Sequence, residues 1–213
     1  MVNRNATATQ AKLLEAARDV IRAKGYAATT VDDICAVAGV SKGSFFHHFA
    51  SKEELGIAAI EAFDAMATGL FASAPYAKLR DPRDRVLGYV DFRISLLHGD
   101  LAQFTCLMGT TVQETYATHP ELRAACDRGL SAHIAVLVGD LTAAKSRYAP
   151  EADWTPESVG YFMQSVLQGA FIFAKAKQRP EVAVACLAHL RRHLEELLRK
   201  SRTKPQTGKE KTR

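Results

Sequence analysis

The chain is short of cysteine and of long apolar runs, and each shortage excludes a class of protein. Its four cysteines, among 213 residues, form no C-x-x-C pair, which argues against a zinc ribbon or a secreted disulfide framework. Residues 1–10 are polar and lack the apolar core of an export signal. No run of about eighteen apolar residues supports a membrane span. We therefore expect a cytoplasmic protein with no membrane partner.

The composition is otherwise that of an ordinary globular chain. Hydrophobic residues make up 47% and charged residues 24%, which excludes a wholly disordered or collagen-like protein. The formal net charge of +5 suggests a polyanionic partner. However, residues 199–213 hold seven basic residues against one acidic residue, so this segment carries nearly all of the excess. We expect residues 199–213 to form a disordered basic tail.

Helical periodicity dominates the rest of the chain, and no strand alternation of useful length is present. The clearest helices run from about Thr9 to Lys24, from Lys42 to His48 and from about Leu101 to Tyr116, and residues 146–153 are expected to form a loop. Further helix starts are marked by Thr29 or Thr30, by Ser51 with Glu54 as a capping box, and by prolines at positions 82, 120, 156 and 180. The sequence predicts an all-α fold of about nine helices.

The first fifty residues contain two short helices separated by a tight turn, Ala38-Gly39-Val40-Ser41, which is typical of a helix-turn-helix. The second helix of such a unit enters the major groove of DNA with its N-terminal residues. Here those residues are Ser41, Lys42, Gly43 and Ser44; Gly43 allows a close approach, and Lys42 can donate to guanine. Periodicity alone leaves a helical hairpin without any ligand as an equal alternative.

The segment from Thr29 to Leu55, TTVDDICAVAGVSKGSFFHHFASKEEL, resembles the N-terminal domain of TetR/AcrR-family transcriptional regulators, and the resemblance covers about residues 9–56. It implies that the first three helices bind operator DNA and that the remainder binds an effector and forms a dimer. The implied domains are a helix-turn-helix domain at 1–50, an effector and dimerisation domain at 51–198, with 51–74 as the connecting helix, and the tail at 199–213.

The same resemblance implies roles for individual residues in DNA binding. Lys42, Ser44 and His47 would reach base edges or nearby phosphates, and Thr30, His48 and Lys52 would hold the DNA backbone. Phe46 stands where family members usually have tyrosine, so it would pack on sugar or on a thymine methyl group. Asp32 and Asp33 would repel phosphate if they faced DNA, and we expect them to serve the start of their helix instead.

A regulator of this kind needs an effector cavity, and polar or soft residues within apolar helical stripes are the candidates for its lining. These are Phe104, Cys106, Met108, Gln113, Tyr116, His133, Tyr161, Gln164, Gln168 and Phe171. For each of them an ordinary core or surface position is the alternative. The effector would be a small, largely apolar molecule.

A two-fold dimer would place two recognition helices on one face of a palindromic operator. Small and apolar residues in the last two helices are the candidates for this interface: Phe162, Ser165, Val166, Gly169, Phe173, Leu187, Leu190 and Leu194. The sequence therefore predicts a homodimeric, ligand-responsive repressor that is not an enzyme and uses no cofactor or metal.

Three alternatives remain open at this level. Cys106 could sense oxidants or electrophiles, although no Lys or Arg lies within a helical turn of it in the sequence, which favours a buried thiol. A di-metal enzyme is disfavoured because no Glu has a His three residues later. A helical adaptor without a ligand would have a filled larger domain.

Overall fold

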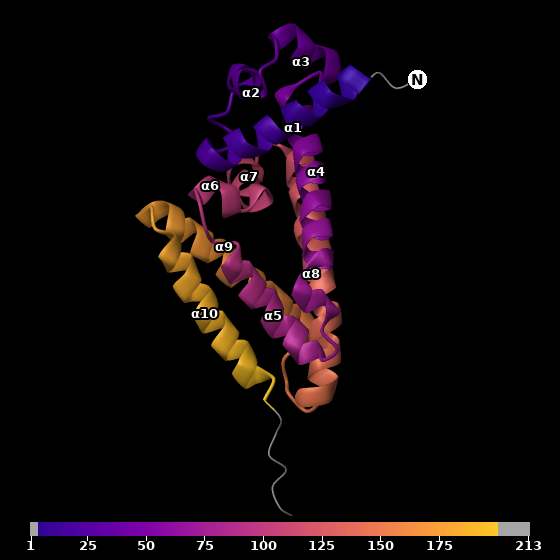
Figure 1. Ribbon diagram of the computed structural model, residues 1–213, viewed down its shortest axis with the longest axis vertical. Helices are drawn as coiled ribbons and strands as arrows, with labels where there is room; N and C mark the ends of the chain where they lie inside the picture. Colours follow the sequence, from indigo (N-terminus) through magenta and orange to yellow (C-terminus); the bar gives the residue numbers. More distant parts are fainter. Residues whose placement is uncertain (1–3, 200–213) are drawn as a thin grey trace, which may run out of the picture.

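The computed structural model describes residues 4–199, and these form ten α-helices, one 3₁₀ turn and no strand (Figure 1). The predicted all-α class is confirmed, and residues 200–213 of the predicted tail lie outside the described residues. The elements are α1 (Arg4–Lys24), α2 (Val31–Ala38), α3 (Lys42–His48), α4 (Lys52–Ser73), η1 (Pro75–Lys78), α5 (Pro82–Ser95), α6 (Leu101–Phe104), α7 (Leu107–Thr115), α8 (Pro120–Tyr148), α9 (Pro156–Lys177) and α10 (Pro180–Leu197).

Local capping signals set most helix starts. The hydroxyl of Thr30 accepts a hydrogen bond from the N–H of Asp33, whose carboxylate accepts from the N–H of Thr30, so α2 begins with a complete capping box. Ser51 likewise caps α4 by accepting from the N–H of Glu54. The predicted capping box is only half formed there, because the carboxylate of Glu54 accepts from the N–H of Ala50 instead.

The helix expected from about Leu101 to Tyr116 is interrupted, which raises the number of helices within residues 4–199 to ten. Thr105 and Cys106 have extended backbone, and the thiol of Cys106 takes the N-cap position of α7 by accepting from the N–H of Gly109 at 3.4 Å. The loop predicted at 146–153 begins later than expected, because α8 continues to Tyr148.

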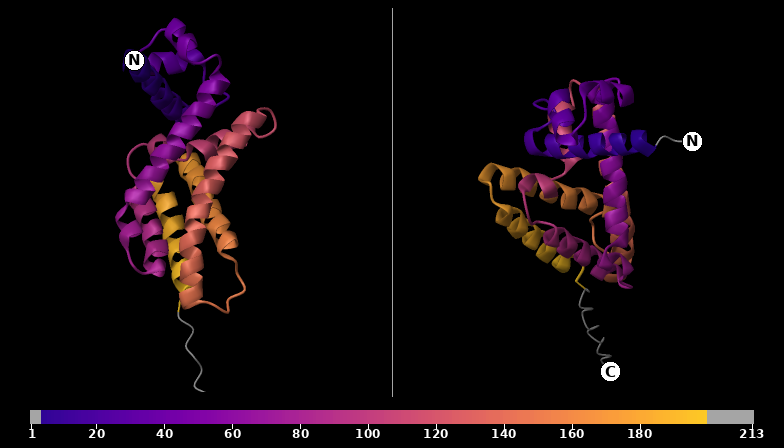
Figure 2. Two further views of the ribbon diagram at one scale, coloured as in Figure 1. Left: turned by 90° about the vertical axis from the view of Figure 1, so that its right-hand side faces the viewer. Right: turned by 45° about the horizontal axis from the view of Figure 1, so that its top comes forward.

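The molecule is elongated, with α1–α3 at one end and α4 leading away from them alongside α8 (Figures 1 and 2). One apolar core lies in this end and includes Leu13, Ile34 and Phe45, but it also takes in Leu107 and Leu122 from α7 and α8. The second core is formed by α5, α8, α9 and α10 with the end of α4. The first core therefore joins the helix-turn-helix unit to the larger bundle.

Helix α4 is, within residues 4–199, the one helix whose length and apolar composition would suffice to cross a membrane. In this structure it packs against α1 and α8 and carries Phe63 and Phe71 into a cavity between the two cores. Those contacts account for its apolar residues.

Candidate functional site

The turn between α2 and α3 sets the recognition helix across the end of the molecule. Gly39 ends α2 with φ of 65°, a conformation that favours glycine, and its N–H bonds to carbonyl oxygens of α2. Phe45 and Phe49 then face the core, while Lys42, Gly43, Phe46 and His47 are exposed on the outside. Two of the three residues predicted to reach the bases, Lys42 and His47, thus lie on the outer face of α3, and the third, Ser44, is partly buried, as is His48.

Lys42 is paired in the absence of DNA. Its ammonium lies 2.9 Å from a carboxylate oxygen of Asp32, and both side chains are exposed. Asp33 instead serves the start of α2, where hydrogen bonds from Lys24 and Thr30 hold its pKa well below the usual range. A phosphate or a guanine would therefore compete with Asp32 for Lys42.

Lys52 is already used inside the protein. Its ammonium donates to the carbonyl oxygens of Tyr26 at 3.0 Å and Thr29 at 2.9 Å and lies 4.2 Å from the centre of the Tyr26 ring. Burial lowers its pKa. This side chain ties the start of α4 to the α1–α2 loop, and only one of its three donors is left for a phosphate. The hydroxyl of Thr30 is likewise bonded to Asp33.

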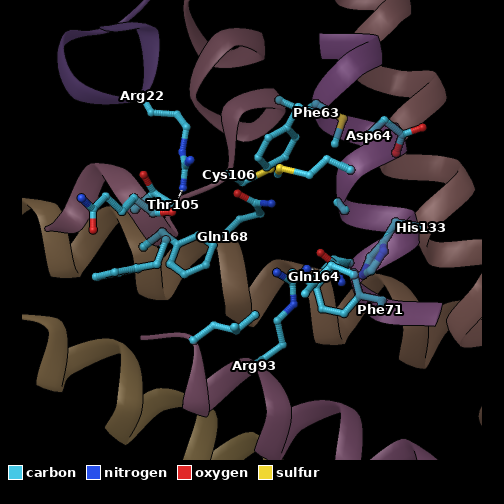
Figure 3. A pocket seen from close by; sticks show the side chains of 18 of the residues that line it. Arg22, Phe63, Asp64, Phe71, Arg93, Thr105, Cys106, His133, Gln164 and Gln168 are labelled. Carbon is cyan, nitrogen blue, oxygen red and sulfur yellow. Dashed lines mark hydrogen bonds between the residues drawn. The ribbon is translucent and has the colours of Figure 1, made fainter. Parts of the chain in front are cut away.

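A cavity of about 270 Å³ lies between the helix-turn-helix unit and the larger bundle (Figure 3). Its wall contains seven of the ten residues predicted for the effector pocket: Phe104, Cys106, Met108, His133, Gln164, Gln168 and Phe171. Gln113 lines a separate depression of about 240 Å³, which Cys106 and Gln168 also line. The structure does not bring Tyr116 or Tyr161 to the cavity, because these side chains are 63% and 59% exposed on the outer faces of their helices.

One polar network crosses the cavity wall. The hydroxyl of Tyr89 receives hydrogen bonds from Gln164 and from Nε of Arg93, each at 3.0 Å, and lies 2.9 Å from Nε2 of His133. Burial and the charge of Arg93 lower the pKa of His133 to about 3, so its imidazole is neutral and its Nε2 accepts a hydrogen bond from the hydroxyl of Tyr89. Arg93 also stacks on Phe71 at 4.2 Å.

Arg22 connects α1 to this cavity, and sequence reasoning missed it. Its guanidinium donates to the carbonyl oxygen of Gln103, and its own carbonyl oxygen accepts from Lys175 of α9 at 3.0 Å. Arg22 follows the buried Ile21 and lies one turn after Arg18, at the edge of the apolar stripe of α1. This position at the edge of the stripe is all that the sequence shows of Arg22, and an arginine there can line a cavity or face solvent equally well.

Cys106 is partly buried and lines both the cavity and the depression beside it. Arg22 and Lys175 interact with it electrostatically, although neither is near it in the sequence. No group of three or more His, Cys, Asp or Glu residues able to hold a metal occurs in the described part of the chain.

Part of the predicted dimer interface must be corrected. Leu187, Leu190 and Leu194 are at most 3% exposed because α10 packs its leucine stripe against α5 and α9 of the same chain. The outer face of α9 is different: Phe162 and Phe173 are 41% and 60% exposed, and Ser165 and Gly169 lie between them. Phe162 touches the ring of His193 on α10, so the two helices share one outer surface.

Comparison with known proteins agrees with this geometry. The model of "Bacterial regulatory proteins, tetR family" matches residues 13–59. The transcriptional regulator AcuR of Cereibacter sphaeroides is 28% identical over 83% of this chain and 81% of its own length. The HTH-type transcriptional repressor NemR of Escherichia coli is 26% identical over 86% of this chain and 92% of its own.

Solved structures give the same result. The reduced form of E. coli NemR superposes with a TM-score of 0.72, at 25% identity, over 85% of this chain and 95% of that one. A TetR transcriptional regulator from Chloroflexus aurantiacus has the same fold, with a TM-score of 0.82 at 22% identity over 93% of this chain and all of that one. AcuR is named as a transcriptional regulator and NemR as a transcriptional repressor.

Proposed function

We propose that this chain, which belongs to the TetR family of transcriptional regulators, is a cytoplasmic repressor that leaves a palindromic operator when a small molecule fills its cavity. Proteins of this family bind operator DNA and form dimers. The observation that carries the proposal is the place of the cavity, whose wall includes Arg22 of α1 and Phe63 of α4. An occupant would touch the two helices that hold the recognition helix.

The domains predicted at 1–50 and 51–198 serve as the two parts of this mechanism. Helix α4 begins in the core that holds Phe45 and ends in the core of the larger bundle, so its tilt couples the two. A ligand shifts this equilibrium only if it binds one arrangement more tightly than the other. The basic tail predicted at 199–213 would add sequence-independent, salt-sensitive affinity for DNA.

For the operator contact, we propose that Lys42, Ser44 and His47 approach the bases, with Gly43 and Phe46 close to the groove. Thr30, His48 and Lys52 remain proposed backbone contacts, with a weaker role for Lys52 because two of its donors serve protein carbonyls. The function can be tested by fluorescence anisotropy with labelled DNA duplexes taken from upstream of the gene that encodes this protein. The binding is measured at several salt concentrations.

Lys42→Ala should lower affinity for the preferred duplex about tenfold and relax its sequence preference. Lys78→Ala is the matched control, since Lys78 is exposed in η1 beyond the far end of α4. A wild-type protein that prefers none of these duplexes would contradict the proposal, as would equal losses in the two variants.

For the dimer, we propose the outer face of α9, with Phe162, Ser165, Val166, Gly169 and Phe173, together with His193 of α10. Exposed aromatic side chains of this kind are common interface anchors. Phe173→Glu should give monomers in analytical ultracentrifugation and weaken operator binding. Val136→Glu, on the outer face of α8, is the matched control and should leave the dimer intact.

A second candidate is regulation through Cys106, which is favoured by its position at the N-terminus of α7 near Arg22 and Lys175. The thiol also lines both the cavity and the depression beside it, and access is one condition for the oxidation or alkylation of a cysteine. Treatment with a quinone electrophile should then release the operator from wild type but not from Cys106→Ser. Cys186→Ser, which removes the other partly buried thiol, should behave as wild type.

A further inference from the structure

Arg22 is a buried charge with too few partners. Its side chain is 6% exposed; Nη2 donates to the carbonyl oxygen of Gln103, and Nε is buried without a hydrogen-bond partner. Burial, and then the charge of Arg18, lower its pKa to about 10, so the guanidinium stays protonated at neutral pH. A buried cation in this state is stabilised by an anion that supplies the missing acceptors.

No carboxylate in the described part of the chain bonds directly to Arg22, although Asp19, one turn earlier on α1, acts on it electrostatically. Among residues 4–199 no ion pair involves Arg22, and Asp64, the acidic residue in the cavity wall, points away from it (Figure 3). Thr105 lies beside the guanidinium at the same end of the cavity. Its hydroxyl is also buried without a partner. Two unpartnered polar groups thus lie at one end of an otherwise largely apolar space.

Arg93, at the opposite end of the cavity, is in a different state (Figure 3). Its Nε donates to Tyr89, its Nη2 lies 3.4 Å from His133, and its guanidinium stacks on Phe71. Arg93 is therefore supplied with partners by the protein itself. Of the two guanidinium groups, Arg22 is the one left to receive an external anion.

The remaining wall suits a hydrocarbon group. Phe104 and Phe171 pack against each other with ring centres 6.1 Å apart, and Phe63 lies under Arg22 at 5.6 Å. A planar guanidinium matches the two oxygens of a carboxylate, and the aromatic rings match an apolar chain or ring. The volume of about 270 Å³ limits the ligand to a small molecule.

We propose that the cavity binds a small organic acid, with its carboxylate on Arg22 and Thr105 and its apolar body between Phe63, Phe104 and Phe171. This names the chemical class of the effector and rests on the proposed function for the link to DNA. The carboxylate of the acid would compete with the carbonyl oxygen of Gln103 for the hydrogen bond that the guanidinium of Arg22 donates.

A ligand bound in this way would be coupled to the recognition helix through Arg22 and α1, and not through α4. Arg22 joins α1 to α6 through Gln103 and to α9 through Lys175. Leu13 and Ile21 of α1 share a core with Phe45 of α3. A carboxylate that draws Arg22 away from Gln103 loosens one of these ties, and α3 moves with α1.

The test compares acids with their primary amides, which have nearly the same shape without the charge. Butyrate, octanoate, benzoate and phenylacetate, and the four amides, are titrated into the full chain without DNA by calorimetry and thermal shift. At least one acid should bind about tenfold more tightly than its amide. Amides that bind as tightly as the acids, or no binding of any of the four acids at millimolar concentration, would overturn the proposal.

Variants locate the anion. Arg22→Gln should abolish the preference for acid over amide and Arg22→Lys should retain part of it, while Arg93→Gln and the exposed Arg128→Gln should keep it. A preference that survives Arg22→Gln but not Arg93→Gln overturns the assignment, and circular dichroism verifies that each variant folds. Operator binding without ligand is measured separately, so a failed acid preference and a failed regulatory function give different results.

Discussion

The helix-turn-helix unit and the cavity next to it treat their polar groups in opposite ways. In the first, Thr30, Ser41 and Ser51 cap their helices and Lys52 satisfies two loop carbonyl groups. In the second, Nε of Arg22 and the hydroxyl of Thr105 are buried without partners. This difference, which is confined to the Arg22 end of the cavity, fits the proposal that a ligand supplies the missing partners, whereas the capping groups of the DNA-binding end are already bonded within the protein.

The largest expected effect tests the packing of the helix-turn-helix unit. Phe45 is fully buried among α1, α2 and α3, so Phe45→Ala should lower the free energy of unfolding by about 3–5 kcal/mol. Phe104→Ala, which only widens an existing cavity, should cost less than about 2 kcal/mol. Urea denaturation of both variants measures the two losses of unfolding free energy. Equal losses would show that the helix-turn-helix core and the cavity wall are packed alike.

Lys52 gives the next effect, and the structure changes what is expected of it. Lys52→Met removes two charge-assisted hydrogen bonds to carbonyl oxygens, so it should cost about 2 kcal/mol of unfolding free energy before any DNA is present. Lys24→Met, which breaks an exposed pair with Asp33, should cost less than about 1 kcal/mol. If Lys52→Met instead kept the wild-type free energy of unfolding but bound all DNA sequences more weakly, Lys52 would act only as a phosphate contact.

These two regions also differ in how far the sequence could predict them. The caps join residues three apart, so Thr30 with Asp33 and Ser51 with Glu54 are visible as local patterns. The contacts of the cavity join distant residues, such as Arg22 with Gln103 and Tyr89 with Gln164. No local pattern encodes those pairs, and for the same reason the buried leucines of α10 could not be told from an interface.

The pH dependence of stability should come partly from the cavity. His133 is held neutral, with its pKa lowered from 6.5 to about 3 by burial and by Arg93. As pH falls below about 6.5 the unfolded chain takes up this proton first, so stability is lost toward pH 3, by at most about 1.4 kcal/mol per pH unit. His133→Gln should flatten this part of the curve in urea titrations, whereas the exposed His189→Gln should not. A wild-type slope unchanged by His133→Gln would place the imidazole in contact with water.

The smallest expected effect is the most direct test of whether the cavity is incomplete. Thr105 and Thr115 are both 1% exposed, but only Thr115 has a partner, donating to the carbonyl oxygen of Thr111 at 2.8 Å. Thr115→Val should therefore lower the free energy of unfolding by about 1 kcal/mol. Thr105→Val should leave it unchanged or raise it by less than about 1 kcal/mol, because no hydrogen bond is lost. The same Thr105→Val protein should bind organic acids more weakly, because it lacks the donor next to Arg22. If both variants lost equal stability in urea denaturation, the hydroxyl of Thr105 would already have a partner, and the cavity would be as complete as the helix-turn-helix unit.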